Sequence, residues 1–261
     1  MVVFEENETN KGFIIKIKTL FTDLKAKKSD FYQRVIIASC LAITTLFVTI
    51  LGGFWFNAAM VAIGVLSAME FVNMIHIKQK NDVKSEDNLD ISYLKKIAIP
   101  YILIPTLSII FIRDATQGRS IIIWFLLSIW SVDTAGYIIG NLFGKNKLYP
   151  SISPNKTIEG ALGGILAGLV ITVILFPIMC LANGSNIEGF SFYSMVFLSL
   201  VISVLSIIGD LFESYIKRQC GVKDSGALLL SHGGMMDRTD SIIFAAPIVA
   251  ILVILKNGVF F

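Results

Sequence analysis

The residues best suited to chemistry lie in one charged segment near the C-terminal end of the chain, 209–241. This segment combines five carboxylates with four basic side chains: Asp210, Glu213, Asp224, Asp237 and Asp240, and Lys217, Arg218, Lys223 and Arg238. Carboxylates alone would suit a cation path, and basic groups alone would suit lipid headgroups. Both together suit a nucleotide, because carboxylates hold Mg²⁺ while the metal and the bases neutralise phosphates.

The spacing predicts that an apolar helix continues past residue 209 into this segment. Positions three and four apart share one face of a helix. Five polar residues would therefore lie close together there: Asp210, Glu213, Ser214, Lys217 and Arg218. Gly221 is a candidate C′ residue that ends this helix.

The second half of the segment is predicted to approach a ligand. His232, Gly233 and Gly234 form a flexible turn, since glycine lets the backbone come close to another group. Asp237 and Asp240 are three positions apart on the expected helix entering the last apolar run. Both carboxylates can then point into the same site.

A second polar segment, 144–157, is predicted as a loop that opens the next helix. Ser153, Asn155 and Thr157 offer capping oxygens, and the helix start behind them leaves free N–H groups where anions bind readily. Lys156 adds a mobile cation. Taken alone, this motif indicates a helix cap as readily as a ligand site.

Two acids lie inside apolar runs. A charge at the centre of a bilayer costs roughly 2.5–3.5 kcal/mol on insertion scales, so such a residue usually faces a wet or paired interior. Asp133 therefore suits either a substrate site or a structural, hydrogen-bonded position. Glu70 is interpreted as lying near the cytoplasmic end of its helix.

Long apolar runs must position these residues. The chain is 55% hydrophobic and 16% charged, against roughly 25% charged in soluble proteins. Seven runs approach the roughly 20 residues that a spanning helix needs: 35–52, 54–76, 97–112, 119–143, 158–182, 192–209 and 241–256. Because lipid leaves backbone groups no other partner, we expect an all-α, polytopic membrane protein with about seven to nine transmembrane helices. The runs lack the polar stripes of a soluble helical bundle.

Positive charge predicts the orientation. With the N-terminus inside, seven Lys/Arg fall in 1–34, five in 77–96, three in 144–157 and four in 210–240, which places 19 of the 22 in the cytoplasm. Residues 1–34 are expected to be a cytoplasmic segment with no cleavable signal peptide, carrying a basic amphipathic helix over 13–28 that lies on the membrane surface. Residues 35–261 are expected to form a single transmembrane catalytic domain.

The charged segment resembles the signature of the phosphatidate cytidylyltransferase family, also called CDP-diacylglycerol synthases. That signature reads Ser-x-x-Lys-Arg-x4-Lys-Asp-x-Gly/Ser/Ala, then His-Gly-Gly-x-x-Asp-Arg-x-Asp. The matching positions are Ser214, Lys217, Arg218, Lys223, Asp224 and Gly226, then His232, Gly233, Gly234, Asp237, Arg238 and Asp240. Upstream, Asp133–Tyr137, Phe143–Lys145, Ser153–Thr157 and Glu159–Gly160 are similar to the family as well.

The resemblance implies transfer of the cytidylyl group of CTP to phosphatidate, giving CDP-diacylglycerol and pyrophosphate, at the cytoplasmic face of a bacterial-type inner membrane. It also implies Mg²⁺, a second cation such as K⁺, and a homodimer. Asp210, Asp237 and Glu213 are then the expected metal ligands, and Asp210, Asp237, Lys217, Arg218 and Asp240 the catalytic group. The expected substrate-binding residues are Asp133, Ser153, Asn155, Lys156, Thr157, Ser214, Lys223, Asp224, His232, Gly233, Gly234 and Arg238.

Two other functions remain open at this point. One is a CTP-dependent transferase that acts on another lipid phosphate or on a polyprenol, since pocket shape decides the acceptor. The other is a cation transporter with Glu70, Asp133 and Asp210 along a path through the bilayer. The clustering of acids beside bases in one segment argues against the transporter. The basic pI is explained by the topology without nucleic acid.

Overall fold

The computed structural model describes residues 36–81, 90–184, 187, 190–229 and 233–256. The chain forms two compact units, Met1–Thr45 and Leu46–Phe261. Of the first unit, the described residues 36–45 are helical and belong to the helix Ile36–Leu51. The amphipathic helix predicted over 13–28 lies outside the described residues.

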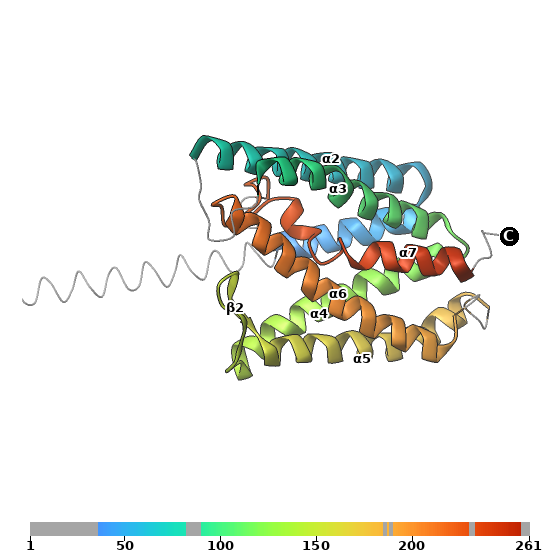
Figure 1. Cartoon of the computed structure of the whole chain (residues 1–261). Coiled ribbons are helices and arrows are strands. Elements are labelled where there is room, and N and C mark those ends of the chain that lie inside the picture. Colours follow the sequence, from blue (N-terminus) through green and yellow to red (C-terminus); the bar gives the residue numbers. More distant parts are fainter. Residues whose placement is uncertain (1–35, 82–89, 185–186, 188–189, 230–232, 257–261) are drawn as a thin grey trace, which may run out of the picture. The chain divides into compact units, whose positions relative to one another are not determined.

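The second unit is built almost entirely from helices, as predicted (Figure 1). Each of the seven apolar runs contains a helix. Besides Ile36–Leu51, these are α2 (Gly53–Asn81), α3 (Ile91–Asp114), α4 (Gly118–Phe143), α5 (Ile158–Ala182), α6 (Phe192–Gln219) and α7 (Ala245–Lys256). In α2 to α6, length and composition are sufficient for a membrane crossing, whereas Ile36–Leu51 and α7 are shorter. The number of crossings and the side of the N-terminus remain predictions.

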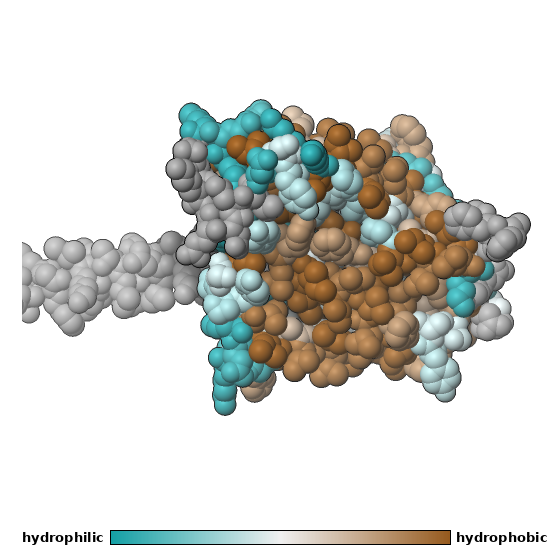
Figure 2. All heavy atoms as spheres, viewed as in Figure 1, coloured by the Kyte–Doolittle hydropathy of each residue, from teal (hydrophilic) through white to brown (hydrophobic). Residues whose placement is uncertain are grey.

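Apolar side chains cover much of the surface along the helices. Phe54, Leu103, Leu166 and Phe197 are examples that are at least about half exposed. In Figure 2 the brown, apolar surface covers the middle of the helices, and teal side chains gather at the end where the hairpin before α5 lies. A multi-pass membrane protein has this distribution, because lipid rather than water surrounds the middle of each helix.

The segment 144–157, predicted as a loop, contains a β-hairpin instead. Strand β1 (Lys147–Tyr149) pairs antiparallel with β2 (Ser153–Thr157), with Lys147 opposite Thr157. Thr157 ends the hairpin and is the N-cap of α5, and its side-chain oxygen accepts the Gly160 N–H at 3.1 Å. The predicted cap is therefore confirmed. The strand passes directly into the helix, which fixes the direction of the side chains just before it.

Helices α4 and α5 pack closely through small residues next to this hairpin. A Cβ atom added to Gly160 would lie 2.6 Å from the Gly136 carbonyl oxygen and 3.0 Å from the Cα of Gly140. Such distances leave no room for a side chain. Glycine at these positions thus lets the two backbones approach, as small residues do in membrane helix pairs.

A hydrophobic cluster joins α2, α3, α6 and the segment before α7. Its members include Phe71 and Met74 from α2, Leu94 from α3, Ile216 from α6 and Met236, all with 3% or less of their surface exposed. The short 3₁₀ helix η2 (Met236–Arg238) is anchored here by the side chain of Met236. This cluster supports the polar residues that adjoin it.

The first half of the charged segment was predicted correctly, and the second half was not. Helix α6 does continue to Gln219, and Gly221 ends it with φ +71° while the Val222 N–H donates to the Lys217 carbonyl at 3.0 Å, a Schellman arrangement. The prediction that one helix carries both Asp237 and Asp240 was wrong. Asp237 lies in η2, Asp240 lies in the turns that follow, and α7 begins only at Ala245.

Candidate active site

A cavity of about 620 Å³ lies where α4, α5, α6, the hairpin and the turns after η2 meet. Glycines of α4 and α5 form part of its wall, and Tyr137, Leu148 and Ile207 add apolar surface. Its wall also carries six charged residues: Asp133, Lys156, Asp210, Asp237, Arg238 and Asp240. The cavity therefore combines acidic and basic groups drawn from segments about 100 residues apart in the chain.

The hairpin brings Lys156 to the cavity. Glu159, in the first turn of α5, accepts the backbone N–H of Lys145 at 3.2 Å and the side-chain amide of Asn146 at 2.8 Å, which holds the entry of the hairpin. The Thr157 cap holds its exit. Lys156 lies between these two fixed points and forms an ion pair with Asp210 of α6.

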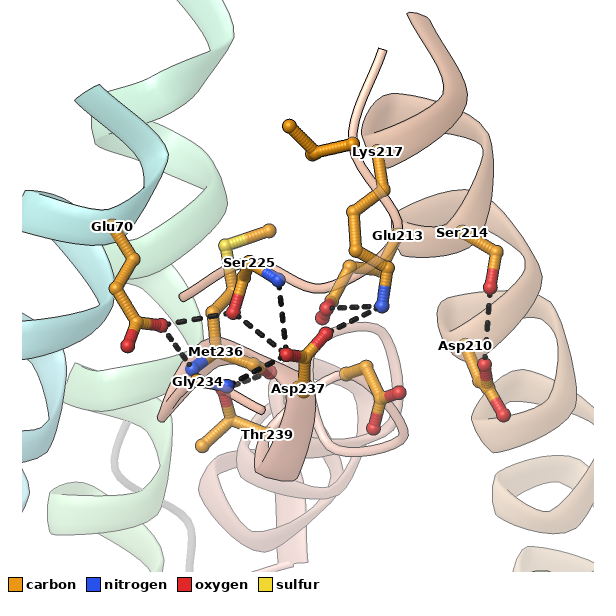
Figure 3. A network of polar contacts seen from close by, with 12 residues as sticks. Glu70, Asp210, Glu213, Ser214, Lys217, Ser225, Gly234, Met236, Asp237 and Thr239 are labelled. Atoms are coloured by element: carbon orange, nitrogen blue, oxygen red, sulfur yellow. Dashed lines mark hydrogen bonds and ion pairs between the residues drawn. The ribbon is translucent and has the colours of Figure 1, made fainter. Parts of the chain in front are cut away.

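Asp237 is held by four hydrogen bonds from three segments (Figure 3). Its Oδ1 accepts Lys217 Nζ at 2.6 Å, and its Oδ2 accepts the Gly234 N–H at 2.8 Å and both the N–H and the hydroxyl of Ser225 at 3.0 Å. Lys217 also donates to Glu213 Oε1 at 3.1 Å. Burial opposes ionisation, but these donors outweigh it and lower the pKa of Asp237 below its ordinary value.

Acids from three elements share one side of the cavity. Ser241 Oγ lies 3.1 Å from both carboxylate oxygens of Asp133, and the Ser241 N–H donates to Asp240 Oδ1 at 2.7 Å. Burial, followed by the negative charges of Asp210 and Asp133, raises the pKa of Asp240 well above its ordinary value. The mutual repulsion of these acids disfavours the ionised form of all three together.

The donor set fits a Mg²⁺ ion that arrives with a phosphate ligand. Within the described residues, no group of three or more His, Cys, Asp or Glu side chains is gathered closely enough to hold a metal ion. Mg²⁺ does not require such a cage, since it usually keeps several waters and binds one or two carboxylates together with substrate phosphates. Asp210, Asp237 and Asp240 offer oxygens of the right kind on the cavity wall.

The structure brings eight of the eighteen expected site residues to the cavity wall and places others around it. Asp133, Asn155, Lys156, Thr157, Asp210, Asp237, Arg238 and Asp240 line it. Ser214 lies behind Asp210, with its hydroxyl 3.5 Å from Asp210 Oδ1. Glu213 is fully buried and outside the cavity wall, and its Oε1 accepts Lys217 Nζ. Gly233, at φ +79°, and Gly234 bring the backbone to Asp237.

Other expected residues do not reach the cavity wall. Arg218 donates to the Val222 carbonyl at 2.8 Å and to the Ile152 carbonyl at 3.4 Å, which ties the end of α6 to the hairpin. Lys223 and Asp224 are exposed, and Ser153 begins β2. His232 lies outside the described residues.

The site also includes residues that sequence reasoning missed. Ser225 and Ser241 each link two carboxylate-bearing segments, and Tyr137 and Asn141 line the cavity. Glu70, interpreted from the sequence as a helix-end acid, accepts the backbone N–H groups of Met235 and Met236. Its position inside an apolar run was the available signal, but the partner segment lies more than 160 positions away.

Comparison with known proteins gives consistent matches. The profile of a family described as the cytidylyltransferase family matches residues 85–255. Proteins named phosphatidate cytidylyltransferase are similar to this chain: one from Staphylococcus haemolyticus is 38% identical over 144 residues, and one from Staphylococcus epidermidis is 40% identical over 144 residues. Each alignment covers 55% of this chain and 53% of the relative. The chain thus matches about half the length of these relatives.

Proposed function

The chain belongs to the cytidylyltransferase family, and we propose that it transfers the cytidylyl group of CTP to phosphatidate, releasing pyrophosphate and forming CDP-diacylglycerol. The observation that carries this proposal is the cavity whose wall combines Asp210, Asp237 and Asp240 with Lys156 and Arg238. The names of the staphylococcal relatives support the choice of both substrates.

The size and charge of the cavity suit a nucleotide. Small-molecule sites usually enclose about 300–1,000 Å³, a range that includes the 620 Å³ found here. Lys156 and Arg238 provide positive charge for the triphosphate, while the aspartates provide oxygen ligands for the cation that accompanies it. A pathway for ions alone would not need basic groups at the same wall.

The reaction requires one phosphate oxygen of phosphatidate to attack the α-phosphorus of CTP. The new O–P bond forms as the bond from the α-phosphorus to the β-phosphate oxygen breaks, and pyrophosphate leaves with the electron pair. A phosphate monoester has a second pKa near 6, so it is already largely dianionic at neutral pH and needs no strong base. His232 then has no obligatory proton-transfer role.

The residues of the chain would orient the two phosphates and balance their charge. Bound Mg²⁺, held by Asp210 and Asp237 with Asp240 adjacent, would supply a Lewis acid that stabilises the attacking and leaving oxygens. Lys217 keeps Asp237 ionised and fixed in direction, with Glu213 on the far side of the lysine. Lys156, beside Asp210, and Arg238, next to Asp237 in η2, would bind the triphosphate.

The same proposal includes the location of the reaction. CTP is dissolved in the cytoplasm and phosphatidate is a bilayer lipid, so the cavity must open at the cytoplasmic surface of a bacterial-type inner membrane. The excess of Lys and Arg in the segments around the cavity supports this side. A second cation such as K⁺ and a homodimer belong to the proposal as implications of the family resemblance.

The choice of lipid acceptor is tested with purified protein, CTP and Mg²⁺. Phosphatidate, an ether-linked phosphatidate and a polyprenyl phosphate are offered in separate mixed micelles, with dolichol as a non-phosphorylated acceptor. We expect cytidylyl-lipid from phosphatidate and from its ether analogue, because the phosphate is the attacking group. Product only from a polyprenyl acceptor would reject phosphatidate as the substrate.

A further inference from the structure

Glu70 of α2 binds the segment that carries Asp237, although it is not among the residues lining the cavity. Its Oε1 accepts the Met235 N–H at 2.9 Å, and its Oε2 accepts the Met236 N–H at 2.9 Å. These are donors at the start of η2, where a helical turn leaves N–H groups without partners inside the helix. Figure 3 shows the carboxylate facing this turn from the neighbouring helix.

Ser225 connects Glu70 to Asp237 directly. Its hydroxyl oxygen lies 2.9 Å from Glu70 Oε2 and 3.0 Å from Asp237 Oδ2. A hydroxyl has one proton to donate, so it serves one carboxylate at a time, and the other keeps its backbone donors. Each carboxylate therefore limits where the other can lie.

The surrounding packing leaves Glu70 and this turn little freedom. The side chain of Met236 is fully buried in the cluster that contains Phe71, the residue after Glu70. A Cβ atom added to Gly226 would lie 2.7 Å from Glu70 Oε1, so glycine there lets the segment close over the carboxylate. A displaced Glu70 would move the backbone that leads directly into Asp237.

We infer that Glu70 is a positioning residue for the transfer reaction, which sets the direction of Asp237 and Arg238 at the cavity wall by binding the start of η2. The inference rests on the proposed function, because it assigns Glu70 a part in that reaction. Glu70 acts through the backbone and through Ser225, with no contact to substrate. It is therefore distinct from the aspartates that would bind the cation.

Glu70→Gln is the decisive variant. Both oxygens accept an N–H, so an amide of the same size would place its own NH₂ against one of these donors and lose that bond. The matched control is Asp90→Asn, which removes the charge from a carboxylate that accepts the Ser92 N–H at the exposed start of α3. Asparagine is also a good N-cap, so this control should stay folded and fully active.

The first readout is hydrogen exchange of backbone amides in the purified protein without substrates. Glu70→Gln should speed exchange at Met235 and Met236, and also at Ser225 and Gly234, whose N–H groups donate to Asp237 rather than to Glu70. The control should change none of them. Unchanged exchange at Ser225 and Gly234 would overturn the inference, since Asp237 would then be held without Glu70.

The second readout is turnover as a function of CTP and Mg²⁺ concentration. Loss of a residue that orients a ligand typically costs about 10–100-fold, and we expect a fall of this size in kcat with a higher Mg²⁺ concentration at half-maximal rate and little change in the KM for phosphatidate. Normal kcat and Mg²⁺ dependence would also overturn the inference. If the wild-type protein were inactive, the proposed function would be rejected instead. The exchange data would then still test whether Glu70 holds Asp237 in place.

Ser225→Ala tests the same inference if Glu70→Gln does not fold. It removes only the hydroxyl link, while the Ser225 N–H still donates to Asp237 and Glu70 keeps two backbone donors. A smaller shift of Mg²⁺ dependence in the same direction supports the inference. Wild-type Mg²⁺ dependence in this variant would contradict it.

Discussion

Each of the two aspartates that would bind the cation is paired with a lysine from a different position in the chain. Asp210 pairs with Lys156 from the hairpin, and Asp237 pairs with Lys217 from α6. The side chain of Lys217 is only 10% exposed, between Asp237 and the buried Glu213, whereas that of Lys156 is 26% exposed. We therefore propose different roles for the two lysines: Lys217 would orient a carboxylate, and Lys156 would move to a phosphate.

The first prediction concerns the two aspartates. Asp210→Asn and Asp237→Asn should each reduce kcat by about 100-fold or more, because a preorganised charge at the reacting phosphates is lost. Turnover is measured with CTP and phosphatidate over a range of Mg²⁺ concentrations, and Asp90→Asn is the control. If either variant kept near-normal turnover, that aspartate would be removed from the cation site.

The second prediction separates Lys156 from a general loss of structure. Lys156→Met should raise the KM for CTP by about 10-fold, which corresponds to about 1.4 kcal/mol, since one positive charge facing the triphosphate is removed. Asp210 is then unpaired, so the Mg²⁺ concentration at half-maximal rate should fall. Lys147→Met is the matched control, because Lys147 is exposed on the same hairpin and does not line the cavity.

A higher KM for CTP together with a lower Mg²⁺ concentration at half-maximal rate would distinguish loss of the Lys156 charge from a damaged hairpin. A damaged hairpin would raise both the KM for CTP and the requirement for Mg²⁺. An unchanged KM for CTP would show that Lys156 does not bind the nucleotide.

At the scale of elements, the close contact of α4 and α5 fixes the cavity. Asp133 comes from α4, Lys156 from the strand that leads into α5, and the glycines between them form a common wall. Asp210 comes from α6, which packs against α5 where Ser199 Oγ donates to the Gly168 carbonyl at 2.9 Å. The separation of the charged groups thus depends on the spacing of the helices.

The third prediction tests this packing with Gly160→Val. The new side chain would meet the Gly136 carbonyl, and overpacking of this kind costs about 1–3 kcal/mol, so the variant should unfold at a lower temperature in detergent and lose turnover. Leu166→Phe is the control, because Leu166 lies on the exposed side of α5 and can accept added volume. Equal stability of the two variants would contradict the close approach of the helices.

The helices could be predicted from the sequence because hydrophobic periodicity and helix caps depend on neighbouring residues. Seven apolar runs predicted seven helices, and Thr157 and Gly221 marked a start and an end correctly, since caps depend on residues within one turn. The two errors have a similar cause. The hairpin is tied to α6 through Arg218 and Asp210, and the turns at 239–244 are tied to α4 through the bond of Ser241 to Asp133. Periodicity does not report such contacts between distant residues.

At the scale of the whole molecule, the charged residues of the cavity come from the C-terminal halves of α4 and α6, from the strand before α5 and from the segment before α7. Lys147 follows the C-terminal end of α4, and Thr116 precedes its N-terminal end. The two positions therefore lie at opposite ends of α4, a helix long and apolar enough to cross a membrane. The sequence could predict this arrangement from the distribution of Lys and Arg. It could not predict which carboxylates meet, because α2, α4, α6 and η2 contribute them from distant positions.

The fourth prediction is the orientation of the cavity. In a Cys40→Ser background, Thr116→Cys should react with a membrane-impermeant maleimide in intact cells or spheroplasts, and Lys147→Cys should react only after the membrane is opened. The reason is that the cavity must meet dissolved CTP. The reverse labelling pattern would place the site on the wrong side for this reaction.

The central claim is that the α-phosphate of CTP passes to a lipid phosphate, and position-specific labelling of CTP tests it most directly. Purified protein is given phosphatidate, Mg²⁺ and CTP labelled at either the α- or the γ-phosphate, and lipid and aqueous phases are counted separately. We predict that the α-label enters the lipid phase as CDP-diacylglycerol and that the γ-label stays in water as pyrophosphate. A γ-label in the lipid, or no label in the lipid from either CTP, would contradict the account.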